Sequence, residues 1–252
     1  METVEPGRVF RLHSARNPRG GLEELEADVF VRSGDAPFPR LFVADMDSTM
    51  ITVECIDELA DYAGVKPQVA EITERAMQGE LDFEAALRER VKLLAGLDAE
   101  VLRRCYAERV RIMPGAETLV RTLKAKGCRT VLVSGGFTAF ADRVAAEIGF
   151  DSARSNLLNI ADGKLDGTVA EPILGAEAKL RTLELEARGL DIRATVAVGD
   201  GANDIPMIRA AGMGVAYHGK PAVVAAAYAA VRYGDLTSIL HGLGVPRAEW
   251  VH

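Results

Sequence analysis

This chain contains several short apolar runs that end abruptly in polar residues. One lies in the first third of the chain and the others lie in its second half. The run LFVAD begins after Arg40 and is followed by MDST, while CRTVLVSGG and ATVAVGDGAND repeat the same pattern further on. A buried parallel strand has this pattern, because both its faces are covered and it delivers a loop at its carboxyl end. A fourth apolar stretch, residues 212–216, predicts one more strand.

Helical patterning fills the spaces between these runs. Apolar residues recur with a 3.6-residue period over four segments, residues 116–126, 138–148, 176–188 and 204–211. Alternation of buried strands with amphipathic helices is typical of α/β proteins. The pattern therefore predicts a doubly wound parallel sheet.

One long stretch breaks the alternation, because residues 54–109 show only helical periodicity. It is joined to the α/β body at both ends, so it can lie over the sheet edge as a lid. We therefore predict a core of residues 40–53 and 111–252, a helical cap of residues 54–110, and an N-terminal extension of residues 1–39 whose role stays open.

Two other segments give weaker patterns. In the extension, RVFRLHS fits a short strand and GLEELEADVFV fits a short helix, but glycines and prolines interrupt anything longer. Residues 155–172 carry an Asp-Gly pair on each side of a short basic segment, which predicts a β-hairpin.

Composition narrows the class of protein. Hydrophobic residues make up 48% of the 252 positions and charged residues 27%, which is ordinary globular usage. The 30 basic and 37 acidic residues give a net charge of −7, so the overall field repels phosphate backbones and a nucleic-acid partner is not expected. No stretch approaches the length of a membrane span or of a secretory h-region, so we expect no membrane partner.

Cysteine and histidine usage fits a reducing cytoplasm. Cys55, Cys105 and Cys128 are odd in number and widely spaced, which suggests neither a disulfide framework nor a zinc site. The four histidines are scattered without metal-ligand spacing, and we interpret His218 and the nearby Lys220 as structural. The sequence leaves the oligomeric state open.

Acidic residues follow two of the predicted strands. Asp45 and Asp47 flank Met46 after the first strand, and Asp200 and Asp204 follow a later one. Ligands of open α/β sheets bind at the carboxyl ends of the strands, so these carboxylates should meet there. Crowded carboxylates repel unless a cation lies among them, and hard oxygen ligands suit Mg²⁺. A lone Asp-x-Asp after a strand is also common as a turn or a helix cap.

Anion-binding groups are expected at the same edge. Ser134, Gly135 and Gly136 offer a hydroxyl and backbone N–H groups just before a helix, and Lys179 lies in a later helix whose ammonium can reach the same anion. Taken singly, Ser-Gly-Gly also fits a plain turn and one helical lysine fits a solvated face. Their order along the chain, together with the acidic pairs, favours function.

That ordered set resembles the motifs of the haloacid dehalogenase-like superfamily of phosphatases. The segments that carry the resemblance are ADMDSTMITVECIDELA, RAMQGELDFEAALRERVKLLAGL, VSGGFT and VGDGANDIPMI, spread over about residues 40–240. The resemblance is strongest to the members that hydrolyse O-phosphoserine. It implies a Rossmann-like core, a magnesium-dependent phosphate monoester hydrolase and a small-molecule substrate.

The resemblance also implies roles for individual residues. Asp45 would be the nucleophile that becomes phosphorylated, and Asp47 the general acid and base. The side chains of Asp45 and Asp200, with the backbone carbonyl of Asp47, would hold Mg²⁺, and Asp204 would order its water shell. The groups that would bind the phosphoryl oxygens are Ser134, the Gly135 backbone, Lys179 and Asn203.

Substrate selection would come from the helical segment. By the same resemblance, Glu54 would bind the ammonium of phosphoserine and Arg90 its carboxylate, while Met77 and Phe83 would shield the pocket. From the residues alone, a glutamate near a helix start also serves the helix dipole, and arginine, methionine or phenylalanine at helical spacing also fits a solvated face or a core.

Four alternatives stay open. A phosphotransferase of the same fold would pass the phosphoryl group to an alcohol such as homoserine, and a related phosphatase would act on another small ester. A phosphoacceptor regulator would also use an acidic cluster, Mg²⁺ and lysine, but the acid at Asp47 argues against the slow hydrolysis it needs. A metabolite-binding protein without turnover is disfavoured by the intact set of acids and lysine.

Overall fold

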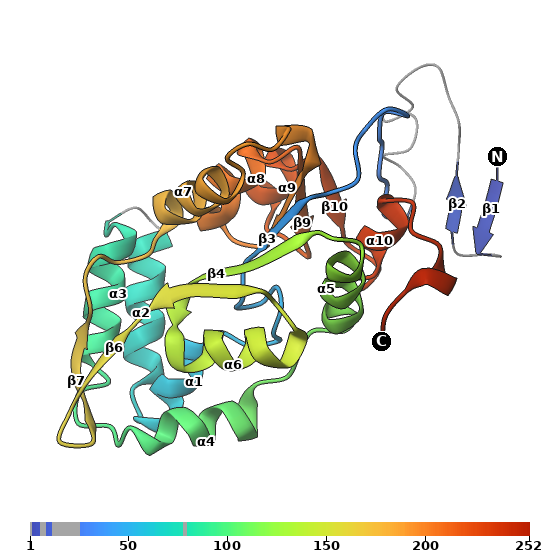
Figure 1. The fold of residues 1–252 in the computed structure, drawn as a ribbon. Helices are drawn as coiled ribbons and strands as arrows, with labels where there is room; N and C mark the ends of the chain where they lie inside the picture. The colour runs from blue at the N-terminus through green and yellow to red at the C-terminus, as the bar shows by residue number, and fades with distance from the viewer. Residues whose placement is uncertain (1, 6–8, 12–25, 78–79) are drawn as a thin grey trace.

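A six-stranded parallel sheet forms the centre of the molecule in this computed structural model, which describes residues 2–5, 9–11, 26–77 and 80–252 (Figure 1). The strand order is β10-β9-β8-β3-β4-β5, and every neighbouring pair is parallel. The strands are β3 (Leu41–Ala44), β4 (Arg129–Phe137), β5 (Ser152–Asn156), β8 (Thr195–Gly199), β9 (Met213–Tyr217) and β10 (Ala229–Val231). The predicted α/β architecture is confirmed.

Both faces of the sheet are covered by helices, because successive side chains of each strand point to opposite faces. Phe42 packs in the core cluster that contains α5 (Ala116–Ala125), α6 (Thr138–Ile148) and α10 (Ser238–Gly242). Leu41 and Val43 pack instead against α7 and α8. Figure 1 shows α7 (Ala176–Glu186), α8 (Ile205–Ala210) and α9 (Pro221–Ala226) as the layer on that second face.

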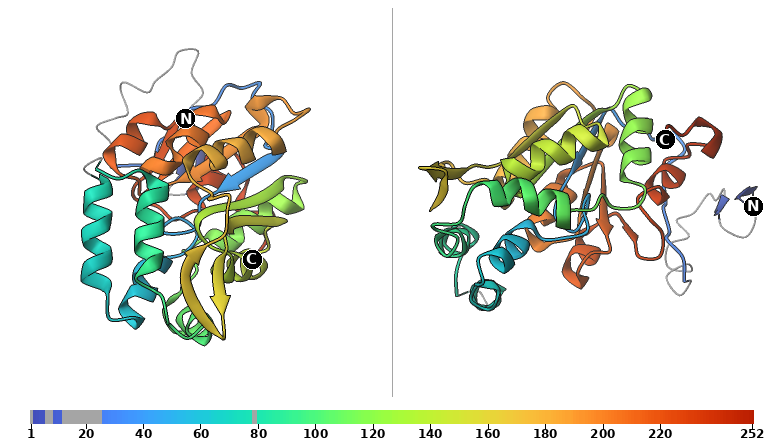
Figure 2. Two further views of the ribbon diagram at one scale, coloured as in Figure 1. Left: turned by 90° about the vertical axis from the view of Figure 1, so that its left-hand side faces the viewer. Right: turned by 90° about the horizontal axis from the view of Figure 1, so that it is seen from below.

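The described residues of the single stretch between β3 and α5, which leave out positions 78 and 79, form four helices. They are α1 (Cys55–Tyr62), α2 (Lys66–Met77), α3 (Phe83–Lys92) and α4 (Glu100–Arg109). The stretch begins and ends at one place, because Ile51 pairs with Ile112 in an isolated bridge and Thr52 N donates to Arg111 O at 3.0 Å. Figures 1 and 2 show α1, α2 and α3 beyond the carboxyl ends of the strands. This is the side on which ligands bind in such sheets.

The hairpin predicted in residues 155–172 is present as β6 (Leu158–Ala161) and β7 (Lys164–Val169). Its turn, Asp162-Gly163, has positive φ at both residues, which is the preferred geometry of a two-residue hairpin turn. The hairpin is bonded to the segment that follows α3, since Gly96 N donates to Leu165 O at 2.8 Å and Leu165 N donates to Leu97 O at 2.9 Å.

Some sequence expectations need correction. Strands β5 and β10 were not predicted, because SARSN is polar and AAV is too short to stand out. Within the helix predicted for GLEELEADVFV, residues 21–25 lie outside the described part and residues 26–31 are not helical. The strand expected in RVFRLHS is present as β2 (Val9–Arg11), paired with β1 (Glu2–Glu5).

Residues 26–39, which we call the strap, run from the β10 edge of the sheet to the start of β3. The ring of Phe30 packs on Gly242, and the Tyr228 hydroxyl donates to Val31 O. Three short 3₁₀ turns complete the described elements: η2 (Ile192–Ala194), η3 (Ala202–Asp204) and η4 (Arg247–Glu249). Across the described ranges, none of the helices has the length and hydropathy that crossing a membrane requires.

Candidate active site

Three neighbouring strands bring the predicted catalytic residues to one edge of the sheet. Asp45 directly follows β3, Ser134 lies near the end of β4, and Asp200 directly follows β8. Because β8, β3 and β4 are adjacent and parallel, their carboxyl ends meet. The structure therefore brings together residues that are up to 155 positions apart in the chain.

A buried lysine joins two of the acids. Lys179 is completely buried, and its Nζ lies 2.7 Å from Asp45 Oδ1 and 2.7 Å from Asp204 Oδ1. Burial alone would lower the pKa of Lys179, but the charges of Asp204 and Asp45 outweigh it and the pKa is raised. The lysine thus stays charged at the centre of the site.

Three acidic side chains gather around the single ammonium group of Lys179. Asp45, Asp200 and Asp204 each offer an oxygen within 4.8 Å of the others. Burial raises the pKa of Asp45 well above its ordinary value, and the like charge of Asp204 adds to this effect although Lys179 opposes it. Burial likewise raises the pKa of Asp200. Three carboxylates around one ammonium leave excess negative charge, which a divalent cation would balance.

Asp204 and Asp200 are held in place by different contacts. Both oxygens of Asp204 are already engaged, one by Lys179 and the other by Gly201 N at 3.0 Å. Asp200 Oδ1 accepts a hydrogen bond from Thr49 Oγ1 at 2.9 Å. Asp204 is therefore placed to hold its neighbours in position, while Asp200 is more open to a ligand.

Asp47 lies beside this cluster and not within it. Its Oδ1 accepts from Cys55 N at 2.9 Å and its Oδ2 accepts from Ser134 Oγ at 3.1 Å. Ser134 Oγ in turn accepts from Gly136 N at 2.8 Å. Burial raises the pKa of Asp47, so this carboxyl group can hold a proton in a range where an exposed aspartate would be ionised. A proton held there is suited to general acid chemistry.

The backbone around Gly135 is fixed by a buried residue that sequence reasoning missed. Asn156 Nδ2 donates to Gly135 O at 2.9 Å and to Leu174 O at 3.2 Å, while its Oδ1 accepts from Leu174 N at 2.7 Å. Asn156 ends the polar strand β5, which carries no apolar run to draw attention to it. It ties the predicted phosphate-binding turn to the segment that leads into α7.

The predicted ammonium-binding residue, Glu54, is the N-cap of α1. Its Oε1 accepts from Ser48 Oγ at 2.6 Å, and Ser48 has a positive φ of 56°. Glu54 is exposed, but the protein packed around its carboxylate removes part of its hydration, and with the negative charge of Asp47 this raises the pKa of Glu54 to about 7. Ser48 and Thr49 both belong to the DMDST motif, but nothing in that motif alone distinguishes them as site residues.

Arg90, the predicted carboxylate-binding residue, lies in α3 and is half-buried. Its Nε donates to Ala86 O at 3.2 Å. Burial lowers the pKa of Arg90, and the charges of Asp57 and Glu54 oppose that effect. The charge of Glu54 therefore acts on Arg90, so the two side chains lie in one part of the molecule.

Three further residues predicted to line the site are Phe83, Asn203 and Met77. The ring of Phe83 lies against Gly135 and Gly175, where a Cβ atom would come within 2.9 Å of it, so it covers the predicted phosphate-binding turn. Asn203 lies in η3, and its Oδ1 folds back over Gly201. Met77 is the last residue of α2, but its side chain lies outside the described part of the structure.

Comparison with known proteins agrees with the geometry of the site. The family model for haloacid dehalogenase-like hydrolases matches residues 39–212. A phosphoserine phosphatase from Streptomyces coelicolor is 49% identical over 212 residues, which is 83% of this chain, and one from Vibrio cholerae is 47% identical over 224 residues, which is 87%. A solved phospho-aspartyl intermediate analogue of phosphoserine phosphatase matches with a TM-score of 0.75 and 40% identity, covering 81% of this chain and 99% of that one.

The relatives differ from this chain in length. The matched region covers 52% of the Streptomyces coelicolor protein and 68% of the Vibrio cholerae protein. The chain thus spans about half to two thirds of these relatives.

Proposed function

This chain belongs to the haloacid dehalogenase-like hydrolases, and we propose that it is a phosphoserine phosphatase, which hydrolyses O-phospho-L-serine to L-serine and inorganic phosphate. The observation that carries the proposal is the buried Lys179 bridging Asp45 and Asp204, with Asp47 and Ser134 hydrogen-bonded beside it. Nucleophile, general acid and anion-binding groups then lie side by side at one edge of the sheet. The names of the matched relatives support phosphoserine as the substrate.

The donor set fits a divalent metal, and we propose Mg²⁺. Hard carboxylate oxygens of Asp45 and Asp200, with the backbone carbonyl of Asp47, would hold the ion. Asp204, whose oxygens are engaged by Lys179 and Gly201, would stay in the outer sphere. When bound, the ion supplies positive charge between the anionic nucleophile and the anionic phosphate.

In the first step, one oxygen of Asp45 attacks phosphorus. The bond from phosphorus to the serine oxygen breaks, and the leaving oxygen takes the proton held by Asp47. Burial raises the pKa of Asp47, so it keeps that proton at a pH where an exposed aspartate would have lost it. Ser134, the Gly135 N–H, Lys179 and Asn203 would stabilise charge on the phosphoryl oxygens as it develops.

In the second step, Asp47 removes a proton from water, and the resulting oxygen attacks phosphorus. The bond to Asp45 breaks, which releases phosphate and restores the nucleophile. Asp47 thereby regains the proton it gave to serine, so the cycle closes without another acid. The same carboxyl group can serve both steps because the hydrogen bond from Cys55 N still holds it when the single hydroxyl proton of Ser134 turns from Asp47 to the phosphoryl group.

Recognition of the amino acid part would fall to the helical segment. Glu54 would accept hydrogen bonds from the ammonium and Arg90 would donate to the carboxylate, while Phe83 and Met77 limit access of water. We include residues 54–110 in this proposal as a cap over the site. A cytoplasmic location is also part of it, supported by Cys55, Cys105 and Cys128, all of which are free and buried.

Phosphate release from O-phospho-L-serine, with Mg²⁺ and with EDTA, tests the proposal. Phosphothreonine, a sugar phosphate and an amino-free phosphate ester run beside it, each with and without homoserine. We expect rapid, Mg²⁺-dependent release that is largest for phosphoserine and unchanged by homoserine. Release that stays slow until homoserine is added would favour the phosphotransferase instead.

The isosteric variant Asp45→Asn provides the matched control. Because an amide cannot attack phosphorus in place of the carboxylate, we expect turnover to fall by about 10³-fold or more. Full activity of this variant would overturn the assignment of the nucleophile. No release with any ester from the unaltered protein would overturn the phosphatase itself.

A further inference from the structure

The strap is bonded to the segment that follows β10. The Asp28 carboxylate accepts three backbone hydrogen bonds, from Arg232 N at 2.6 Å, Tyr233 N at 3.1 Å and Gly234 N at 2.9 Å. One carboxylate therefore fixes a turn of three consecutive residues, which we call the β10 turn (residues 232–234). Because β10 is parallel to the other strands, the β10 turn lies at the same edge of the sheet as the active site.

The β10 turn holds His218 in turn. His218 follows β9, its N donates to Val231 O at 2.8 Å, and its Nε2 lies 3.1 Å from Gly234 O, to which the Nε2–H tautomer donates. His218 also has a positive φ of 44°. A residue other than glycine in this region costs free energy, so the surrounding contacts must hold it there.

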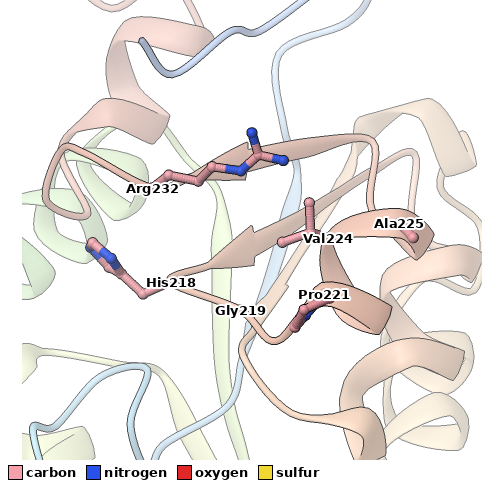
Figure 3. Close-up of a pocket in the computed structure, with 6 residues that line it drawn as sticks. All are labelled: His218, Gly219, Pro221, Val224, Ala225 and Arg232. Atoms are coloured by element: carbon pink, nitrogen blue, oxygen red, sulfur yellow. The ribbon is translucent and has the colours of Figure 1, made fainter. Parts of the chain in front are cut away.

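The loop that begins at His218 ends on the metal-binding segment of the proposed function. Lys220 N donates to Asp200 O at 3.2 Å, and Asp200 is the carboxylate most open to a metal. A groove of about 570 Å³ separates the β10 side from α9, with His218 and Arg232 on its walls (Figure 3). Val224 of α9 and Ala230 of β10 pack on one small apolar cluster, and the hydrogen bonds of His218 and Lys220 add a directional connection between the two sides.

We propose that Asp28 and His218 are positioning residues for Asp200, acting through the β10 turn and residues 218–220. Asp28 fixes the turn, the turn fixes His218, and His218 fixes the loop whose Lys220 N–H holds the Asp200 backbone. This inference rests on the metal site of the proposed function. It gives the strap, which lies outside the catalytic motifs, a part in forming the metal site.

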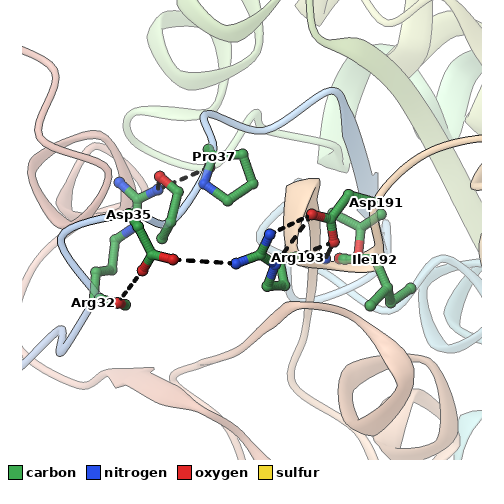
Figure 4. Close-up of polar contacts among 9 residues, drawn as sticks. Arg32, Asp35, Pro37, Asp191, Ile192 and Arg193 are labelled. Carbon is green, nitrogen blue, oxygen red and sulfur yellow. Dashed lines mark hydrogen bonds and ion pairs between the residues drawn. The ribbon is translucent and has the colours of Figure 1, made fainter.

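The other end of the strap offers a matched control. Arg32 donates to Leu243 O, Ala36 O and Pro37 O, and Arg193 joins Asp35 to Asp191 (Figure 4). These contacts lie near the start of β3 and β8, at the opposite edge of the sheet. Arg32→Met therefore loosens the strap without touching the β10 turn.

Binding of Mn²⁺ to the metal-free protein, measured by the electron paramagnetic resonance signal of free Mn²⁺ well below the unfolding temperature, tests the inference. We expect Asp28→Ala to raise the Kd for Mn²⁺ by about tenfold, as loss of outer-sphere support does in other metal sites. His218→Gly, which keeps the positive φ but removes the imidazole, should raise it similarly. The double variant should be no worse than either single variant, because both act through one connection.

Arg32→Met should lower Tm as Asp28→Ala does, but leave the Kd for Mn²⁺ unchanged. An unchanged Kd in Asp28→Ala, or an equal rise in Arg32→Met, would show that the strap only stabilises the fold and would overturn the inference. Should Asp28→Ala not fold, Asp28→Asn replaces it. Its single acceptor oxygen can keep the bonds from Arg232 N and Tyr233 N but not the bond from Gly234 N, so we expect a smaller rise in the Kd, and no rise would overturn the inference. Absence of Mn²⁺ binding by the unaltered protein would instead overturn the metal site of the proposed function.

Discussion

Asp45 and Asp204 both accept hydrogen bonds from Lys179 in a region without solvent access. Removing one partner of a buried ion pair leaves an uncompensated charge, which costs about 3–5 kcal/mol. We therefore expect Lys179→Met, which nearly preserves side-chain volume, to lower the free energy of unfolding by that amount at pH 7. The loss should shrink at lower pH, because the unpaired carboxylates take up protons and become neutral.

Urea denaturation measures this effect. Lys124→Met is the control, because Lys124 is exposed and its ion pair with Asp151 should contribute less than about 1 kcal/mol. Equal losses in the two variants would contradict the role of Lys179 as the balancing charge.

Glu54 predicts a pH dependence of substrate binding. Its pKa is raised to about 7, so the carboxylate becomes protonated as pH falls below 7 and loses its attraction for an ammonium. If Glu54 binds the ammonium of phosphoserine, KM should rise about tenfold between pH 8 and pH 6. Steady-state kinetics over this range provide the measurement.

Two controls separate this titration from others. The phosphate group itself titrates near pH 6, so an amino-free phosphate ester must be measured in parallel. Its KM should change much less than that of phosphoserine, and Glu54→Gln should show a high KM that is nearly independent of pH. The same pH dependence with both esters would contradict the assignment of Glu54.

At the scale of single elements, α3 presents two arginines to different surroundings. Arg90 is half-buried and senses Glu54, whereas Arg88 is exposed and pairs with Glu84 and Glu171. Truncating a buried group that binds a charged partner costs about 2–5 kcal/mol. We expect Arg90→Ala to lower kcat/KM for phosphoserine by about 30-fold or more, with little effect on an aryl phosphate.

Arg88→Ala is the matched control, since it removes a guanidinium from the same helix without facing the site. Its kcat/KM should stay within about twofold of the unaltered protein. Equal losses on phosphoserine and the aryl phosphate in Arg90→Ala would make Arg90 a structural residue.

Replacing Asn156, the last residue of β5, should disturb the turn around Gly135 in β4. Asn156→Ala removes the partners of Gly135 O, Leu174 O and Leu174 N. Because these backbone groups are partly buried, leaving them unpaired costs about 1–3 kcal/mol. We expect that loss in urea denaturation, together with weaker competitive inhibition by inorganic phosphate. Asn159→Ala, in the partly exposed hairpin, should change neither by much.

The strands that sequence patterns identify are those buried on both faces. LFVA, VLV and VAVG are apolar throughout because helices cover each side of them, and the polar residues that follow them could be placed at one edge from topology alone. Strand β5 is polar and β10 is three residues long, so neither carries a periodic signal. The helix expected near residue 28 failed because Asp28 and Phe30 bind the β10 turn and α10 instead.

Site residues divide in a similar way. Asp45, Ser134 and Asp200 follow from their positions at strand ends. Thr49 and Asn156 could not be predicted, because their roles depend on contacts with residues 151 and 18 positions away that only the folded chain brings near. Local pattern thus predicts which side chains reach the site, and tertiary packing decides which side chains hold them.

At the scale of the whole molecule, the excess of acid at one edge predicts that a divalent ion stabilises the fold. A ligand that binds only the folded state adds about 2.7 kcal/mol at 100 times its Kd. For a chain of this size we expect Tm to rise by about 5–10 °C between EDTA and saturating Mg²⁺. Thermal unfolding followed by circular dichroism measures the shift.

Asp200→Asn is the control for that shift. It removes a proposed ligand and one of the crowded charges, so its Tm in EDTA should not fall, and Mg²⁺ should raise it little. A full Mg²⁺ response in this variant would place the ion elsewhere.

The bridge between Ile51 and Ile112 has a consequence for how such a protein can change over generations. Because the four helices of residues 55–109 leave and rejoin the sheet at one point, a different insert of any length can replace them without stretching the strands. The residues that carry the chemistry lie outside those four helices and would be inherited intact. New substrate preferences can then arise by exchanging one contiguous stretch of gene, while the reaction itself stays under older, slower selection.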